Sequence, residues 1–153
     1  MKIDAKSIKA LREDTGAGVL DCKKALEEVN GDLKKAKAVI LEKGLAKADK
    51  KADRETSQGL VETYVHGGGK IGVMLELLCE TDFVARNSDF KLLAHELAMH
   101  IAAMEPKDIS EFMKQSYIRD MNVTIENFIK QHIAKIGENI VVKRFVRYAL
   151  GEE

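Results

Sequence analysis

Glycines in the middle of this 153-residue chain have the spacing of phosphate-binding loops. Gly67, Gly69 and Gly72 match a dinucleotide-binding fingerprint, but that loop must lead into a helix, and a second strand-like run follows here. The pattern Gly-x-x-x-x-Gly-Lys-Ser/Thr also fails, because Tyr64 replaces its first glycine and Ile71 follows the lysine. The glycine run therefore predicts a hairpin turn between two strands.

Histidines and cysteines are the other residues with catalytic or metal-binding potential. His95, Glu96 and His100 form His-Glu-x-x-x-His, one residue longer than the zinc-protease motif, and five helical residues turn the two rings about 140° apart. Cys22 and Cys79 are far apart in apolar surroundings, which favours two reduced, buried thiols. With no nucleophile beside a base and no suitably spaced pair of acids, we expect no catalytic centre, no metal site and no cofactor.

The junction between a strand-like run, residues 71–79, and an amphipathic helix beginning near Ser88 carries Asp82 and Phe83. A plain turn would use Gly, Pro, Asn or Ser, and such loops normally run over the surface. Two interpretations are open. Phe83 turns inward as a core plug, since phenylalanine is often buried, or it points outward as a wedge for a partner, since aromatic residues dominate interface hot spots.

Three short amphipathic periods in residues 3–43, each closed by glycine, predict a small helical bundle that resembles a UBA-like module, a type that usually binds proteins. We expect its third helix to stop at Gly44. Val19 and Leu20 are consecutive at a helix start, so they cannot both face one core. One of them is either exposed beside the glycine turn, or it forms a hydrophobic staple or a shallow core contact. The apolar positions of the three helices are Ile3, Ile8 and Leu11; Val19, Cys22, Leu26 and Val29; and Leu33, Ala36, Val39 and Ile40.

A charged connector follows, rich in lysine and arginine. Its default interpretation is a solvated helical face; phosphate binding is the alternative, although no aromatic residue is interleaved for base stacking. Beyond it the chain alternates strand-like and helical runs. Strands are predicted at 60–66, 71–79 and 140–148, and helices at about 88–104 (ended by Pro106), 109–113 and 125–136.

These runs predict an α+β fold in which a three-stranded antiparallel sheet is packed with helices on one face. The last strand carries apolar residues on both faces, so it is either covered on each side or covered by a second chain. The expected domains are a UBA-like three-helix domain over 1–44, the charged connector over 45–56, and an α+β core and dimerisation domain over 57–153.

The overall composition limits the class of protein. Apolar residues make up 45% of the chain and charged residues 33%, and the net charge is zero, which argues against a general binder of nucleic acid or anionic membranes. No apolar run approaches the roughly 18 residues of a membrane helix, and no signal-peptide core is evident, so we expect a cytoplasmic protein. Three classes remain: a binding module with an aromatic wedge, an enzyme, and a nucleic-acid accessory protein with steeply salt-dependent binding.

Four blocks of sequence resemble the bacterial elongation factor Ts family, the nucleotide-exchange factors of elongation factor Tu. They are residues 11–26, with Leu-Arg-Glu-Asp-Thr-Gly-Ala-Gly; residues 47–52; residues 79–85, Cys-Glu-Thr-Asp-Phe-Val-Ala; and residues 134–140, Ala-Lys-Ile-Gly-Glu-Asn-Ile. The blocks occur in family order and span nearly the whole chain. The Thr-Asp-Phe-Val block at a strand end is specific to the family.

The resemblance implies that the Asp-Phe loop enters the G domain of the partner near the Mg²⁺ and phosphates of its nucleotide. Phe83 would be the wedge and Asp82 its polar companion, with Thr81 and Val84 shaping the loop. The helical module would meet another part of the G domain, and the connector would add one contact. This chain has Val-Leu where relatives often carry Met-Met. The implied contacts outside the loop are Arg12, Val19, Leu20, Lys23 and Lys51.

The resemblance also implies a mechanism without bond chemistry. The factor would bind elongation factor Tu in its GDP-bound and nucleotide-free forms, promote GDP release and let GTP rebind. Long relatives carry a second core subdomain, and short relatives replace it by pairing two chains. We therefore expect a homodimer through the final strand, and no direct contact with nucleic acid or membrane.

Overall fold

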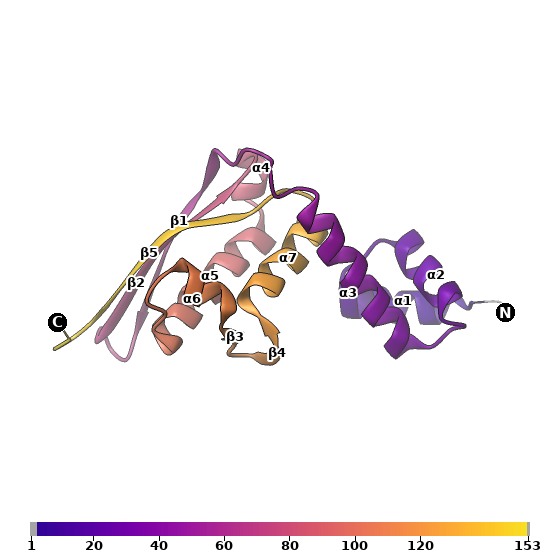
Figure 1. The fold of residues 1–153 in the computed structure, drawn as a ribbon, viewed down its shortest axis with the longest axis horizontal. Coiled ribbons are helices and arrows are strands. Elements are labelled where there is room, and N and C mark those ends of the chain that lie inside the picture. Colours follow the sequence, from indigo (N-terminus) through magenta and orange to yellow (C-terminus); the bar gives the residue numbers. More distant parts are fainter. Residues whose placement is uncertain (1–2, 153) are drawn as a thin grey trace.

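The computed structural model describes residues 3–152, and its N-terminal part is a three-helix module (Figure 1). The helices are α1 (Ala5–Thr15), α2 (Val19–Glu28) and α3 (Leu33–Asp49). The side chains of Asp4 and Asp32 cap the starts of α1 and α3 by accepting backbone N–H groups. The apolar stripes predicted from the sequence meet in a small separate core of Leu11, Cys22, Ala25, Leu26 and Ala36.

Helix α3 does not end at Gly44, as the sequence predicted, but continues to Asp49. A glycine inside a helix lowers its stability without terminating it. Here Gly44 packs against α7 (Ile125–Ile136), where a Cβ on the glycine would meet the Cβ of Ala134 at 3.4 Å, an ordinary contact distance. The first part of the predicted connector is therefore helical, and α3 carries Ala48 into the core of the second part of the chain (Figure 1).

The second part contains the predicted three-stranded antiparallel sheet, which is confirmed. Strands β1 (Gln58–His66), β2 (Ile71–Cys79) and β5 (Val141–Ala149) run in the order β1-β2-β5. Three glycines with positive φ, residues 67–69, form the β1–β2 hairpin turn, so the glycine run is a turn as expected. On β2, alternate residues Val73, Leu75, Leu77 and Cys79 are buried toward the helices.

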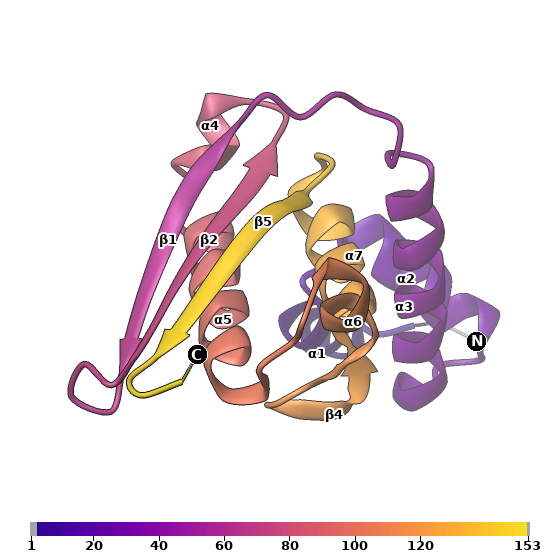
Figure 2. The ribbon, with the colours of Figure 1, turned by 60° about the vertical axis from the view of Figure 1, so that its left-hand side comes forward.

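Helices cover one face of this sheet, as an α+β fold predicts. Helix α5 (Ser88–Met104) lies behind the strands in Figure 2, and α6 (Ile109–Lys114) and α7 complete the layer. Asn87 caps the start of α5, and Glu105 in a left-handed conformation closes it just before Pro106. Phe90, Leu97 and Phe112 are fully buried in the shared core. None of the described helices is long and apolar enough to cross a membrane.

A two-stranded ribbon, β3 (Ser116–Tyr117) with β4 (Asp120–Thr124), was not predicted. A strand of two residues is too short to show an alternating pattern, so the sequence gave no signal for it. The ribbon packs through Tyr117, whose ring stacks on Phe128 of α7 with centroids 4.1 Å apart.

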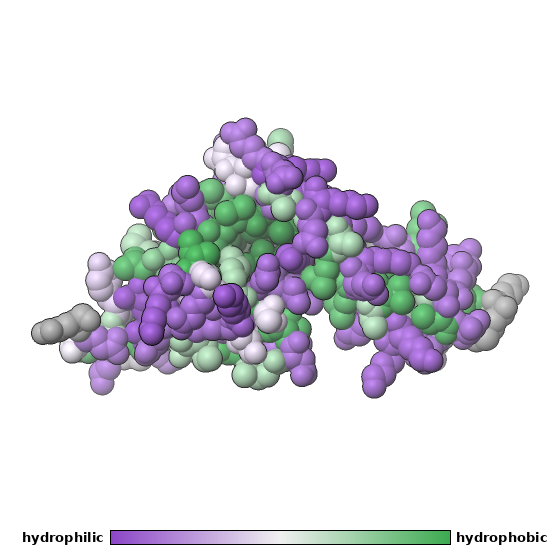
Figure 3. Space-filling model, viewed as in Figure 1, coloured by the Kyte–Doolittle hydropathy of each residue, from purple (hydrophilic) through white to green (hydrophobic). Residues whose placement is uncertain are grey.

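The opposite face of the sheet carries exposed apolar side chains. Val142 and Phe145 of β5 face the helices, whereas Val146 and Tyr148 face away and are exposed. Figure 3 shows the sheet from its β5 edge, where apolar side chains gather between β5 and the helices and charged side chains surround them. The interpretation that this chain covers both faces of its last strand is therefore wrong, and coverage by a second chain stays a prediction. The exposed apolar residues of this face are Val61, Val65, Met74, Val141, Val146 and Tyr148.

Candidate functional site

The Asp-Phe segment is a short helix, α4 (Asp82–Ala85), and not the loop that the sequence suggested. It begins directly after β2, and Thr81 caps it: the Oγ1 atom of Thr81 accepts the backbone N–H of Val84 at 3.3 Å. Val84 and Ala85 are half-buried against the main core. Thr81 thus caps the start of this segment and Val84 packs it against the core, and the contact of both residues with a partner stays a prediction.

Phe83 points into solvent, with 81% of its surface exposed. Successive residues of a helix are turned by about 100°, so directing Val84 and Ala85 toward the core turns Phe83 outward. The core-plug interpretation is therefore wrong. An exposed phenylalanine on a capped helix is instead a rigid apolar projection, the kind of side chain that anchors protein–protein interfaces.

Asp82 and Arg86 form a charged pair beside the exposed ring. The Asp82 carboxylate pairs with the Arg86 guanidinium, and Arg86 Nε donates to the Asp82 carbonyl at 3.3 Å. Both side chains are more than half exposed. Such a pair is screened by water and contributes little to stability, so it leaves both charges accessible to a binding partner.

Glu138 holds the start of α4 from a distant part of the sequence. Its Oε1 atom accepts the backbone N–H groups of Glu80 at 3.1 Å and Thr81 at 3.0 Å, and its Oε2 atom accepts the Thr81 hydroxyl at 2.7 Å. No role was predicted for Glu138 from the sequence. The only signal was its place in the block 134–140, because its partners lie more than fifty residues away.

A second set of hydrogen bonds joins this site to the connector. Glu80 Oε1 accepts the backbone N–H of Asn139 at 2.8 Å and lies 3.6 Å from Arg54 Nη1. The buried Asn139 side chain donates from Nδ2 to the carbonyls of Ala52 at 3.3 Å and Arg54 at 3.0 Å. Three chain segments, the end of β2, the α7–β5 junction and the α3–β1 connector, therefore meet beneath α4.

The two cysteines are free and buried, as predicted. Cys79 lies next to the site, and its Sγ donates to the Thr81 carbonyl at 3.2 Å. Burial, followed by the negative charge of Glu138, raises the pKa of the Cys79 thiol to about 11. The thiolate is therefore scarce at neutral pH, which makes Cys79 a poor nucleophile.

The two histidines of the His-Glu-x-x-x-His pattern, His95 and His100, do not share a site. His95 is exposed, whereas His100 is fully buried, with Nε2 2.9 Å from Gln115 Oε1. Within residues 3–152 no group of three His, Cys, Asp or Glu side chains is placed to hold a metal ion.

A second exposed apolar surface lies on the helical module. Val19 is 49% exposed and Leu20 is 71% exposed, so both side chains point outward and the hydrophobic-staple interpretation is wrong. Arg12 and Lys23 are also exposed, while Lys51, just after α3, is half-buried. Figures 1 and 2 both show α2 well separated from α4. The structure thus does not bring the predicted site residues into one cluster but into two surfaces on separate parts of the molecule.

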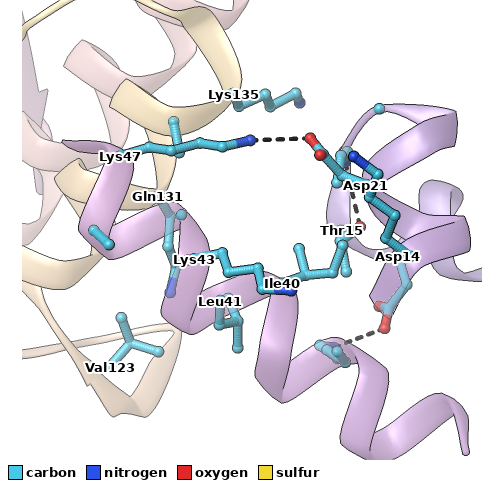
Figure 4. A pocket seen from close by; sticks show the side chains of 18 of the residues that line it. Asp14, Thr15, Asp21, Ile40, Leu41, Lys43, Lys47, Val123, Gln131 and Lys135 are labelled. Carbon is cyan, nitrogen blue, oxygen red and sulfur yellow. Dashed lines mark hydrogen bonds and ion pairs between the residues drawn. The ribbon is translucent and has the colours of Figure 1, made fainter. Parts of the chain in front are cut away.

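A cleft of about 670 Å³ separates the helical module from α7 (Figure 4). Within the module, Lys47 of α3 pairs with the Asp21 carboxylate of α2 at 3.0 Å, and Lys37 of α3 pairs with Asp14 of α1 at 2.8 Å. The stem of Lys135 lies over Gly16, 3.1 Å from where a Cβ would stand. Two of the lining lysines thus pair with carboxylates inside the module, and Lys135 of α7 contacts the module from the other side of the cleft.

Comparison with known proteins identifies relatives of this chain. The family model described as Elongation factor TS matches residues 80–153, which begin at the end of β2 and include α4. Elongation factor Ts of Coprothermobacter proteolyticus is 45% identical over 197 positions, covering 99% of this chain and 100% of the relative. The protein of the same name from Fervidobacterium nodosum is 47% identical, with the same coverage. The chain belongs to the elongation factor Ts family.

Membership of the elongation factor Ts family assigns the chain to translation elongation. Relatives differ in length. Elongation factor Ts from a Nostoc species is 47% identical over 152 positions, which cover 99% of this chain but 48% of the relative. The alignments with the Coprothermobacter and Fervidobacterium proteins span more positions than this chain has residues, so those relatives contain insertions that it lacks.

Proposed function

We propose that this chain is a guanine-nucleotide exchange factor that binds elongation factor Tu and promotes the release of GDP. The observation that carries the proposal is Phe83, which is 81% exposed on a helix whose start is capped by Thr81. The match of the family model to the segment that contains α4 supports it. The factor forms and breaks no covalent bond, so it is not an enzyme in that sense.

The mechanism is thermodynamic linkage between two ligands of the same partner. A factor that binds nucleotide-free elongation factor Tu more tightly than the GDP-bound form must weaken GDP binding by the same ratio. Equal binding to both forms would shift nothing. Phe83 supplies the differential contact: inserted between elements of the G domain, it is buried only in the conformation in which the Mg²⁺ and phosphate contacts are loosened.

The size of this contribution follows from the exposed ring. Burying a phenylalanine side chain stabilises a complex by about 1.5–3 kcal/mol. Asp82 provides a charged group beside the ring, at the edge of the contact. Thr81 and Val84 hold the backbone of α4 in place. The second contact surface comprises Val19 and Leu20 of α2. Flanking contacts come from Arg12, Lys23 and Lys51.

The test is the release of a fluorescent GDP analogue from elongation factor Tu after addition of excess unlabelled GDP. Wild-type chain accelerates release, and Phe83→Ala lowers the acceleration per unit concentration roughly ten- to hundredfold. Met121→Ala is the matched control, because Met121 is a large apolar side chain that is 64% exposed on β4, away from both surfaces. No acceleration by the wild-type chain would contradict the function. Full activity of Phe83→Ala would contradict the wedge and would transfer the main contribution to the surface around Leu20.

We also propose that the chain forms a homodimer through the bare face of its sheet. Met74 occupies the centre of this face, opposite Thr63 on β1 and Val146 on β5, and it is 51% exposed. Light scattering at micromolar concentration measures the mass. We expect the mass of a dimer for wild type and the mass of a monomer for Met74→Lys. The control Met121→Lys stays dimeric, and a monomeric wild type would contradict the proposal.

The remaining proposals concern organisation and location. We propose a UBA-like domain over residues 1–44, a charged connector over 45–56 and an α+β core over 57–153, supported by the two separate buried cores. Ion pairs between the two parts, such as Lys130 of α7 with Asp49 of α3 at 3.0 Å, hold the connector helix in place. The proposed setting is the cytoplasm, without direct binding of nucleic acid or membrane.

A further inference from the structure

Glu138 makes hydrogen bonds that no regular element would otherwise provide. The β1–β2 ladder ends with the pairing of Gln58 and Cys79, so the backbone N–H groups of Glu80 and Thr81 lie beyond the sheet. Glu80 and Thr81 also precede α4, so their N–H groups take no part in the hydrogen bonds within that helix. Backbone donors in partly buried positions need an acceptor. Glu138 Oε1 is that acceptor, at 3.1 and 3.0 Å.

The second carboxylate oxygen extends the network into the helix itself. Glu138 Oε2 accepts the Thr81 hydroxyl at 2.7 Å, and Thr81 Oγ1 in turn accepts the N–H of Val84 at 3.3 Å. The hydroxyl proton is thereby directed at Glu138, which leaves a lone pair of Oγ1 for the helix. A four-residue helix has little stability of its own. Its orientation therefore depends on the packing of Val84 and Ala85 against the core and on the network that fixes its cap.

The fold itself fixes the position of Glu138 next to Glu80 and Thr81. Helix α7 ends at Gly137 in a left-handed conformation with φ of 89°, a C-cap that favours glycine and turns the chain out of the helix. Asn139, the next residue after Glu138, is fixed by Glu80 and by the connector carbonyls. Among the described residues, the side chain of Glu138 hydrogen-bonds to Glu80 and Thr81 alone.

We propose that Glu138 is a positioning residue of the exchange reaction, which sets the direction in which Phe83 is presented to the partner. This inference rests on the proposed function. Without the carboxylate, α4 samples several orientations and only a fraction of the molecules present the ring correctly. The apparent affinity falls by that fraction, whereas the rate in the saturated complex, where the partner itself holds the ring, is unchanged.

The experiment compares Glu138→Ala and Glu138→Gln in the GDP-release assay over a range of factor concentrations. Glu138→Ala raises the half-saturating concentration about tenfold, because bonds to a charged acceptor are lost, and leaves the plateau rate unchanged. Glu138→Gln recovers most of the wild-type value, since its amide oxygen still accepts both N–H groups. Glu126→Ala is the control, because Glu126 is an exposed carboxylate on α7, the helix that precedes Glu138, and it pairs with Lys130.

A double variant separates positioning of Phe83 from a general effect on the fold. If Glu138 acts through Phe83, adding Glu138→Ala to Phe83→Ala changes the half-saturating concentration less than twofold. A tenfold effect that persists in the Phe83→Ala background overturns the proposal, as does wild-type activity of Glu138→Ala. Loss of activity in Glu138→Gln together with native circular dichroism overturns it too.

Failure of this inference is distinguishable from failure of the proposed function. If wild type does not accelerate GDP release, the proposed function is wrong. The orientation of the side chain at position 83 can still be measured in the variant Phe83→Trp, because the chain contains no other tryptophan. In that background Glu138→Ala lowers the fluorescence anisotropy of the indole if Glu138 fixes α4. Unchanged anisotropy overturns the positioning role without reference to exchange.

Discussion

Asn139 offers a sharp test of the network beneath the site. Its side chain is 4% exposed and donates two hydrogen bonds from Nδ2, to the carbonyls of Ala52 and Arg54, while its backbone N–H is bound by the Glu80 carboxylate. The site therefore contains acceptors and requires a donor. Aspartate has nearly the same shape as asparagine but offers only acceptors. We predict that Asn139→Asp is more destabilising than Asn139→Ala, although it removes fewer atoms.

The magnitudes follow from the number and type of the contacts. Asn139→Ala removes two neutral hydrogen bonds, each contributing roughly 0.5–1.5 kcal/mol, so the free energy of unfolding falls by about 1–3 kcal/mol. Asn139→Asp loses the same bonds and adds a buried negative charge that faces the two carbonyl oxygens. An uncompensated buried charge costs about 3–5 kcal/mol.

The assay is urea unfolding followed by far-ultraviolet circular dichroism at pH 7.5, with midpoints compared at constant slope. Asn122→Asp is the matched control, because Asn122 is exposed on β4 and the same substitution there changes stability by less than about 0.5 kcal/mol. If Asn139→Asp is as stable as Asn139→Ala or more stable, the side chain does not serve as a donor to the connector and the reasoning is refuted.

Two further predictions concern buried titratable groups. The pKa values of His100 and His132 are lowered, mainly because burial disfavours the charged ring. Unfolded histidines titrate near about 6.5, so the folded state binds fewer protons than the unfolded state below that pH. The free energy of unfolding is therefore fully retained above about pH 7 and falls as the pH drops below about 6.5. Urea midpoints between pH 7.5 and 5.5 check this, with a flatter profile expected for His100→Gln; a midpoint that rises toward acid would contradict it. Separately, Cys22 and Cys79 are both 0% exposed, so Ellman's reagent labels neither thiol of the native chain at pH 8 within minutes and labels both in concentrated urea. Fast labelling of the native chain would refute their burial.

Much of the architecture was readable from local patterns. Apolar spacings of three and four predicted the helices, and the glycine run with flanking β-rich segments predicted the β1–β2 hairpin. The error at Gly44 has a tertiary cause: the glycine lies against Ala134 of α7, and packing overrides its low helix propensity. The β3–β4 ribbon escaped prediction because it depends on the stacking of Tyr117 on Phe128 rather than on any local period.

The candidate site, like the fold, could be predicted only in part from the sequence. Its sequence blocks pointed to Phe83, Val19 and Leu20, but the residues alone left each of them open between an inward and an outward position. The structure decided all three by exposure, because the direction of a side chain depends on which neighbouring residues the core takes in. Glu138 was invisible as a functional residue, since its role exists only when residues 57 and 58 positions apart meet.

By itself the sequence determined the order and type of most elements, because those depend on periodicity and turn chemistry within a few residues, while its resemblance to the family indicated the segments in which candidate binding residues lie. Only the tertiary structure decided that Phe83 is presented outward on a capped helix, and that Glu138 and Asn139 tie this helix to the connector. The physical reason is that hydrogen bonds between distant segments become possible only after the sheet and α7 have packed. Local preferences cannot specify which donors that packing leaves without an acceptor.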